Sequence, residues 1–170
     1  MAEQRVVIAD AGPLIAVSRV GVLHLLPSMF GEVWITDAVR KEVCDAGAFP
    51  GQDLILAALS VGGLRCVAVD MTHWQPRFAG IDPGEASAIA LAEAVNATPE
   101  TRALLIVDDR LGRLEAQARG LAVIGTAALV GLAKTRALIP RADVVLRAMQ
   151  ANGYFLGQAV VRAVLDRVGE

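Results

Sequence analysis

Cysteine is scarce in this chain of 170 residues, and Cys44 and Cys66 are the only two. Two cysteines make neither a disulfide scaffold nor a zinc site of four cysteines. Adding His24 and His73 would bring four potential ligands, but no pair stands at the spacing of a zinc knuckle. We therefore expect two buried thiols in a reducing compartment, and hence a cytoplasmic protein.

Long hydrophobic runs are also missing. Residues 120–133 form the longest charge-free stretch of the C-terminal half, and glycine and threonine interrupt it. A helix that spans a membrane needs about 18 apolar residues, so we expect none. The first apolar run ends at Asp10 without a cleavage site, which argues against a signal peptide. Yet 55% of the residues are hydrophobic, more than an ordinary globular domain uses. This surplus predicts a homodimer, with Val22–Met29 and Thr126–Arg136 as its seam.

Lysine is nearly absent, because all but Lys41 and Lys134 of the 16 basic residues are arginine. The net charge of −2 argues against nucleic-acid binding through bulk charge. Arginine binds phosphate with a bidentate fork, although a GC-rich genome would produce the same bias. Glycine-rich phosphate loops are missing too, since Gly12 stands alone after the first apolar run.

Short runs rich in valine and isoleucine alternate with longer helical patterns. The predicted strands are Val6–Ala9, Val33–Ile35, Arg65–Val69, Leu104–Val107 and Ala122–Ile124. The predicted helices are Pro13–Val20, Val22–Met29, Asp37–Cys44, Gln52–Leu59, Pro83–Asn96, a helix from Arg110 to Gly120, Thr126–Arg136, Ala142–Ala151 and Gln158–Val168. The first and fourth strands are almost wholly apolar, as in a parallel sheet covered on both faces. We therefore predict one three-layer α/β/α domain, residues 1–170, around a parallel sheet of about five strands.

Carboxylates follow several of these strands. Asp10 comes directly after the first, Asp108 and Asp109 come after the fourth, and Glu42 and Glu85 lie on the helices after the second and third. Ligands of open parallel sheets bind beyond the carboxyl ends of the strands, so these acids should meet at one edge. Gathered carboxylates repel one another unless a cation is present. An all-oxygen ligand set favours Mg²⁺ or Mn²⁺ over zinc.

Each acid also has a purely structural interpretation. Asp10 could simply end its strand, Glu42 could lie on a solvated helix face, and Glu85 could only close a capping box with Asp82. Of the aspartates at 108 and 109, one could face the pocket while the other caps the next helix. Strand alternation turns these two to opposite sides unless the chain bends between them.

The chain resembles the PIN-domain family over residues 5–155, and in particular a prokaryotic branch described as predicted nucleic-acid-binding proteins. The segments that carry the resemblance are, in order, VIADAGPLIAVSRVGVLHLLPSMFGEVWITDAVRKEV, DPGEASAIALA and LLIVDDRLGRLEAQARGLAVIGTAALVGLAKTRALI. The resemblance implies a Mg²⁺- or Mn²⁺-dependent endoribonuclease with RNA as its substrate. Many members are toxins, which implies an antitoxin protein as a partner.

The resemblance also implies roles for individual residues. Asp10, Glu42 and Glu85 match the family's first three acids, and Asp109, or else Asp108, matches the fourth. Asp10 and the aspartate after the fourth strand would be the primary metal ligands, and the two glutamates would complete the shell. With Asp109 as the ligand, Asp108 is left to cap the helix or to hold a partner behind the ligands. Arg110, Arg113 and Arg77 would hold the RNA backbone.

The chain departs from the family at hydroxyl-bearing positions. Many members carry serine or threonine just after the first aspartate, where this chain has Ala11 and Gly12, and two residues before the last, where it has Val107. Thr126 could supply a replacement hydroxyl or could cap its helix. The missing hydroxyls leave an alternative open, a non-catalytic PIN-like module that binds nucleic acid or protein and retains an acidic pocket.

Overall fold

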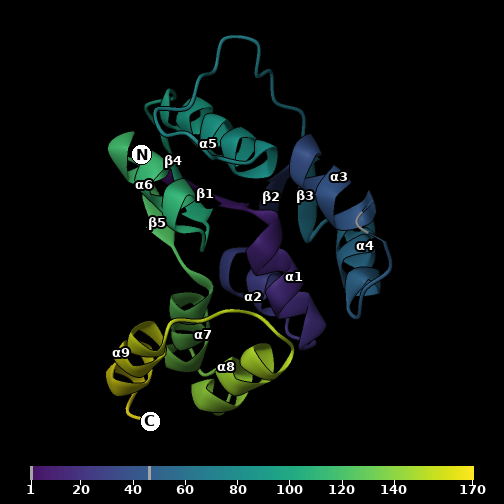
Figure 1. Ribbon diagram of the computed structural model, residues 1–170, viewed down its shortest axis with the longest axis vertical. Helices are drawn as coiled ribbons and strands as arrows, with labels where there is room; N and C mark the ends of the chain where they lie inside the picture. The colour runs from purple at the N-terminus through teal and green to yellow at the C-terminus, as the bar shows by residue number, and fades with distance from the viewer. Residues whose placement is uncertain (1, 46) are drawn as a thin grey trace.

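A parallel sheet forms the centre of the chain, which the computed structural model describes over residues 2–45 and 47–170 (Figure 1). Its strands are β1 (Gln4–Ala9), β2 (Val33–Thr36), β3 (Leu64–Val67), β4 (Thr101–Ile106) and β5 (Ala122–Ile124). They lie in the order β3-β2-β1-β4-β5, and all four pairings are parallel. The chain therefore builds outward from β1 in both directions. The carboxyl ends of β1 and β4 meet where that direction changes, which is where open sheets bind ligands.

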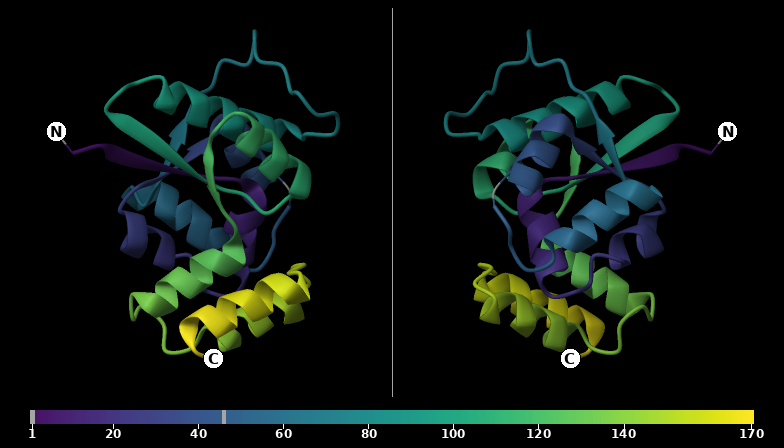
Figure 2. Two further views of the ribbon diagram at one scale, coloured as in Figure 1. Left: turned by 90° about the vertical axis from the view of Figure 1, so that its left-hand side faces the viewer. Right: turned by 90° about the vertical axis from the view of Figure 1, so that its right-hand side faces the viewer.

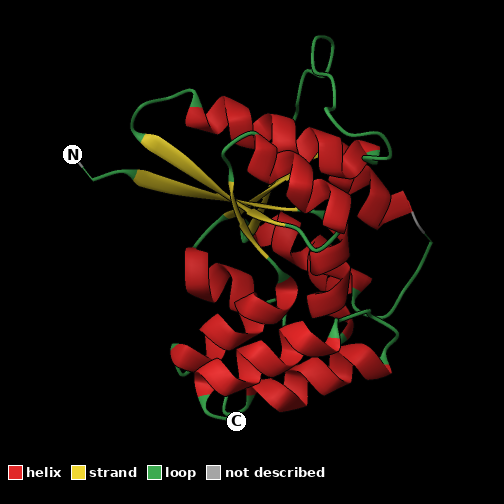
Figure 3. Cartoon of the chain, turned by 60° about the vertical axis from the view of Figure 1, so that its left-hand side comes forward, coloured by secondary structure: helices red, strands yellow, loops and turns green. Residues whose placement is uncertain are grey.

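Helices cover both faces of this sheet (Figure 3). They are α1 (Ala11–Arg19), α2 (Leu25–Phe30), α3 (Asp37–Asp45), α4 (Gln52–Val61), α5 (Pro83–Asn96), α6 (Arg110–Ala118), α7 (Thr126–Thr135), α8 (Ala142–Ala151) and α9 (Gln158–Val168). Alternate residues of β1 point to opposite faces, as strand geometry requires. Val6 and Ile8 join a core with α5 and α6, whereas Val7 and Ala9 join a larger core with the other helices.

The last three helices form a separate layer at one end of the molecule (Figure 2). Helix α7 begins directly after β5 and contributes Leu129 and Val130 to the larger core. Helix α8 contributes Leu146 and Met149, while α9 packs on α7 with no fully buried residue of its own. The long connection between β3 and α5 lies at the opposite end (Figure 2).

The predicted fold is confirmed, with differences at the ends of strands. Strand β3 stops at Val67 because its only neighbour, β2, ends at Thr36, so the predicted Ala68 and Val69 have no strand to pair with. Strand β4 begins three residues earlier than predicted, since β1 pairs with it from Gln4 onward despite the polar start of both strands. The hydroxyl of Thr36 accepts the N–H of Val39 at 3.1 Å, which explains the start of α3.

The expectation of two buried thiols is wrong in part. Cys66 is exposed on β3, which is an edge strand, and Cys44 is half-buried on α3. Several apolar side chains of the segments proposed for a dimer seam are already buried within the chain. Leu25, Leu26 and Leu129 all lie in the larger core. Within the described residues, no helix is long and apolar enough to cross a membrane.

Candidate functional site

Asp10 stands at the point where β1 gives way to α1. Its backbone N–H donates to the carbonyl of Ile106 at 3.0 Å, which ties it to the neighbouring strand. Only 7% of the residue is exposed, and its Oδ1 has no hydrogen-bond partner among the described residues. Burial above all, together with the charges of the nearby carboxylates, raises the pKa of this carboxyl to about 8. Burying a carboxylate oxygen without a partner costs free energy of folding, and a bound ligand would offset that cost.

Helix α5 presents a second acid to the same place. The Asp82 side chain accepts the N–H of Glu85 at 2.8 Å, and the Glu85 side chain accepts the N–H of Asp82 at 3.4 Å. The predicted capping box is therefore present, with Pro83 in the first turn. Glu85 is only 4% exposed, and burial, Asp82 and Asp109 raise its pKa to about 7. The capping box therefore holds Glu85 in a position in which its side chain is buried.

Gly84 shows how closely these acids approach one another. A Cβ on this glycine would lie 2.7 Å from Oε2 of Glu42, 3.3 Å from Oδ1 of Asp82 and 3.6 Å from Oδ1 of Asp10. Three carboxylate oxygens therefore lie close to the position that a Cβ of residue 84 would occupy. Burial and the charge of Asp82 raise the pKa of Glu42 as well. We call Asp10, Glu42, Asp82 and Glu85 the acidic cluster.

The acidic cluster has the chemistry of a divalent cation site. Its donors are all carboxylate oxygens, it contains an unpaired buried oxygen, and oxygens of three of its members approach Gly84 closely. Over residues 2–45 and 47–170, no ion pair with Arg, Lys or His reaches the cluster. In the same residues no group of three or more His, Cys, Asp or Glu is arranged to hold a metal ion as it stands. Binding would therefore have to draw the carboxylates together.

The twin aspartates match their predicted roles only in part. Asp109, not Asp108, caps α6: its Oδ2 accepts the N–H of Leu111 at 2.7 Å and of Gly112 at 3.1 Å. Asp108 instead accepts the backbone N–H of Thr126 at 2.8 Å. Of the two roles expected for Asp108, the cap is taken by Asp109, because α6 starts at Arg110 as predicted and the residue just before it is the N-cap. Asp108 holds partners instead. Asp109 remains close enough to the acidic cluster for its charge to raise the pKa of Glu85.

Two residues of the site were missed or undervalued in the sequence. Asp82 had been interpreted only as a helix cap, yet its position between Glu42 and Glu85 makes it a member of the acidic cluster. Tyr154 donates its hydroxyl to Oδ2 of Asp108 from the turn between α8 and α9. No spacing signal connects residues 46 positions apart. The only available clue was that Tyr154 is the sole tyrosine of the chain.

A groove of about 460 Å³ runs away from Asp108. Its walls are α6, the start of α7 and the turn before α9, and they include Arg110, Arg113, Leu114, Gln117, Phe155 and Val160. Phe155 is 89% exposed. Arg113 is tethered through one Nη to the carbonyl of Val107 at 3.2 Å. Two of the three predicted RNA-contacting arginines therefore share one groove with Asp108.

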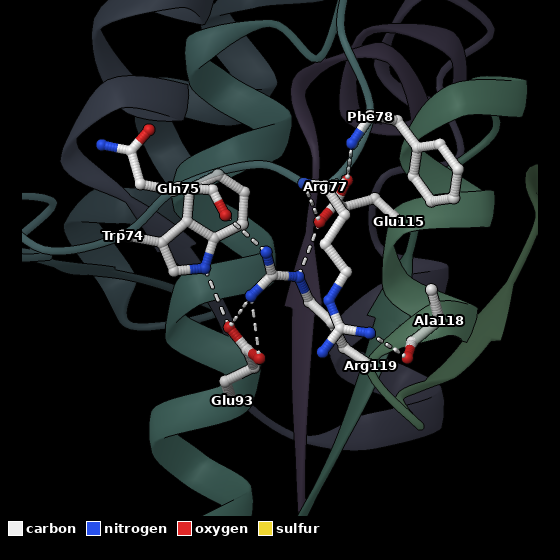
Figure 4. Close-up of polar contacts among 8 residues, drawn as sticks. All are labelled: Trp74, Gln75, Arg77, Phe78, Glu93, Glu115, Ala118 and Arg119. Atoms are coloured by element: carbon white, nitrogen blue, oxygen red, sulfur yellow. Dashed lines mark hydrogen bonds and ion pairs between the residues drawn. The ribbon is translucent and has the colours of Figure 1, made fainter.

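Arg77 lies apart from that groove, in a cluster that holds the β3–α5 connection on α5 and α6 (Figure 4). The fully buried carboxylate of Glu115 accepts the backbone N–H groups of Arg77 and Phe78 at 2.9 Å each. It also accepts Nε of Arg119 at 2.7 Å. We call Glu115, Arg119 and the groups bound to them the loop clasp. Its effect is to fix the segment that leads into Asp82.

Arg119 completes the loop clasp on its other side (Figure 4). It binds Glu93 at 2.8 Å and the carbonyl of Gln75 at 2.6 Å. Its guanidinium also stacks 4.4 Å from the centre of the Trp74 ring, whose N–H donates to Glu93 at 2.8 Å. Every charge in the loop clasp is thus paired, in contrast to the acidic cluster.

Comparison with known proteins places the chain in a family. Among solved structures, it resembles a PilT N-terminus domain protein from the hyperthermophilic archaeon Sulfolobus solfataricus P2, at 20% identity and a TM-score of 0.46 over 74% of this chain and 89% of that one. No curated protein matches its sequence. A family model, DUF3368, described as a PIN domain, matches residues 6–170. PIN domains are generally nucleases and typically use divalent metal ions. The match spans nearly the whole chain, which therefore belongs to the PIN-domain family.

Proposed function

We propose that this protein is an endoribonuclease that depends on Mg²⁺ or Mn²⁺. The observation that carries the proposal is the unpaired, buried Oδ1 of Asp10 among the carboxylates of Glu42, Asp82 and Glu85. Folding alone gains nothing from an uncompensated group of carboxylates, because each raises the cost of ionising the others. A divalent ion held by Asp10, Glu42, Asp82 and Glu85 would supply a Lewis acid and an acidified water for phosphodiester hydrolysis.

The chain's own residues prepare this site in three ways. The capping box fixes the backbone of Asp82 and Glu85, which limits how far their carboxylates have to move to reach a cation beside Asp10. The raised pKa values of Asp10 and Glu85 mean that both carboxyls are partly protonated near neutral pH without a cation. Ion binding therefore has to release protons, as for other ligand sets that bind deprotonated.

The groove supports RNA as the substrate. Arg110 and Arg113 present guanidinium groups beside Asp108, where a phosphate chain would leave the acidic cluster. The exposed ring of Phe155 offers an unpaired base a surface on which to stack. With a net charge of −2 the protein would bind RNA through this local arrangement and not through its overall charge.

A non-catalytic PIN-like module is the alternative, and the lack of hydroxyls at Ala11, Gly12 and Val107 had favoured it. The structure brings two other hydroxyls, those of Thr126 and Tyr154, onto Asp108. This arrangement favours the nuclease. The two functions are separated by titrating the protein with Mn²⁺ and then assaying it on RNA, because only the nuclease both binds the ion and cleaves.

We further propose a homodimer that works in the cytoplasm, with a toxin role and an antitoxin partner as an extension of the nuclease function. Free thiols at Cys44 and Cys66 agree with a reducing compartment. Exposed apolar side chains such as Val61, Val144 and Phe155 agree with a protein partner or second subunit. Light scattering at high micromolar concentration tests the dimer, and a small neighbouring gene whose product blocks cleavage tests the antitoxin.

The decisive experiment is an RNA cleavage assay with the purified chain. We expect cleavage in Mn²⁺ or Mg²⁺, none in EDTA, and none from Asp10→Asn, whose fold should be intact because the swap keeps the shape and removes one charge. Anomalous density near Asp10 in a crystal soaked in Mn²⁺ would locate the ion. An Asp10→Asn variant as active as the parent would show that the acidic cluster takes no part in the reaction.

A further inference from the structure

Tyr154 connects the C-terminal helices to the sheet edge. It lies in the turn between α8 and α9, and its backbone N–H donates to the carbonyl of Met149 at 3.0 Å, which fixes the turn on the end of α8. Its half-buried side chain reaches back to β4 and donates its hydroxyl to Oδ2 of Asp108. A segment late in the chain thus contributes one polar atom to the edge formed by the first and fourth strands.

The hydroxyl also lies near Gly12. A Cβ on this residue of α1 would lie 3.7 Å from Oη of Tyr154. The phenol oxygen therefore lies near the first turn of α1, two residues after Asp10, while it binds Asp108. Asp10 and Asp108 follow two neighbouring strands, β1 and β4, so Tyr154 reaches the edge of the sheet where both strands end.

Asp108 is held by three donors in all. Oδ1 accepts the N–H of Thr126 at 2.8 Å, and Oδ2 accepts the Thr126 hydroxyl at 2.5 Å together with the Tyr154 hydroxyl. A carboxylate offers about four acceptor positions. Three are therefore occupied, and the group is fixed in rotation with one acceptor position left on Oδ1. A carboxylate that only ended a strand would not need donors from two segments that lie apart in the chain.

We propose that Tyr154 is a positioning residue of the active site, which holds Asp108 in the orientation needed at the edge of the sheet where β4 ends beside β1. This inference rests on the proposed nuclease function. It makes the docking of α8 and α9 a requirement for activity, since their connecting turn supplies the hydroxyl. Thr126 and Tyr154 share the task, because both of their hydroxyls act on the same carboxylate oxygen.

The test uses Tyr154→Phe in the full chain, which removes one hydroxyl and keeps the ring. Three quantities are measured: Mn²⁺ affinity by calorimetry, kcat on an RNA substrate, and KM for that substrate. We expect Mn²⁺ affinity and kcat to fall about 10- to 100-fold, the usual effect of losing a group that orients a metal site. KM should stay within about twofold, because the arginines of the groove are untouched.

Two further variants make the result specific. Thr135→Val removes a hydroxyl that binds only the carbonyl of Gly131 within α7, and it should behave like the parent. Gly12→Ser, added to Tyr154→Phe, brings a hydroxyl next to the space that the phenol oxygen leaves, and it should restore part of the lost kcat. If Tyr154→Phe proves unfolded, Thr126→Val, which removes the other hydroxyl from Oδ2, should show the same loss in kcat and Mn²⁺ affinity.

The outcomes also separate this inference from the proposed function. Tyr154→Phe with parental Mn²⁺ affinity and kcat, or with a loss confined to KM, overturns the inference while leaving the nuclease intact. A parent that binds Mn²⁺ but cleaves no RNA overturns the nuclease, and weaker Mn²⁺ binding by Tyr154→Phe then still supports the positioning role. A parent that neither binds Mn²⁺ nor cleaves RNA overturns both.

Discussion

Gly84 and Glu42 fit together so closely that residue 84 has no room for a side chain: a Cβ there would lie 2.7 Å from Oε2 of Glu42. Gly84→Ala would displace the Glu42 carboxylate from the acidic cluster, because a Cβ and a carboxylate oxygen that are not bonded do not approach within 2.7 Å of each other. We expect metal-dependent cleavage to fall by more than tenfold, the scale of a displaced site group. The helix itself should tolerate the change, since alanine is the better helix former by about 1 kcal/mol.

Gly63→Ala is the matched control for that variant. Its Cβ would meet Pro27 at 3.6 Å and Ala58 at 3.9 Å, both ordinary contacts, and neither residue belongs to the acidic cluster. Activity of Gly63→Ala should equal that of the parent. A Gly84→Ala enzyme with full activity in Mn²⁺ would show that Glu42 takes no part in the site.

Asp10 makes stability depend on pH in an unusual direction. The pKa of this carboxyl is 3.8 when unperturbed and about 8 in the fold, where burial is the main cause. Between those values the folded chain holds a proton that the unfolded chain has lost, so raising the pH favours unfolding. In EDTA the melting temperature should therefore fall from about pH 5 to about pH 8. Glu85, with a pKa raised to about 7, acts in the same direction.

Asp10→Asn removes the titrating group and should flatten this decline, and it should raise the melting temperature at pH 8. Asp53→Asn, at an exposed acid in the first turn of α4, should leave the decline as it is. Excess Mn²⁺ should restore stability at the high-pH end, because the ion binds the folded state alone. A melting temperature that rises steadily through this range in EDTA would contradict the burial of Asp10.

The sequence was sufficient for the fold and for part of the site. Apolar strands and capping residues are local signals, so the parallel sheet and the box of Asp82 and Glu85 could be predicted. The roles of Asp108 and Asp109 depend on where the chain bends after β4, and no local pattern encodes a bend of one residue. The contact between Tyr154 and Asp108 depends on how α7 to α9 pack against the sheet. Long-range packing of this kind lies outside the reach of spacing arguments.

The twin aspartates can be separated by stability and activity together. Asp109→Ala removes the cap of α6 and should cost about 1 kcal/mol of the free energy of unfolding, whereas Asp109→Asn keeps a capping side chain and should cost much less. Asp108→Asn replaces an acceptor oxygen of a group that binds three donors, so it should lower both stability and activity. Urea unfolding and the cleavage assay measure the two effects. An Asp108→Asn variant with parental stability would contradict the observed contacts.

The loop clasp should matter mainly for stability. Glu115→Gln leaves the half-buried Arg119 without one of its two carboxylates and faces an amide N–H toward backbone donors. Breaking a buried pair from one side costs about 3–5 kcal/mol, so a large drop in the free energy of unfolding is expected. Glu32→Gln, which breaks a surface pair with Arg65, should cost less than about 1 kcal/mol. Equal effects of the two changes, measured by urea unfolding, would mean that the loop clasp is not a single buried unit.

Phe155 provides the last prediction, because a ring that is 89% exposed contributes little to the fold. It lines the groove with Arg110 and Arg113, where an unpaired base can stack on it. Phe155→Ala should weaken binding of a labelled single-stranded RNA, measured by anisotropy in EDTA so that nothing is cleaved, by about 1–3 kcal/mol. Phe155→Trp should keep the affinity. Arg110→Ala should remove about one phosphate contact, so the dependence of the RNA affinity on salt concentration should become weaker. Val61→Ala, at an apolar residue that is exposed on α4 and outside the groove, serves as the control. If Phe155→Ala binds RNA as the parent does but dissociates a dimer or loses a protein partner, the groove is a protein interface and the path of the RNA lies elsewhere.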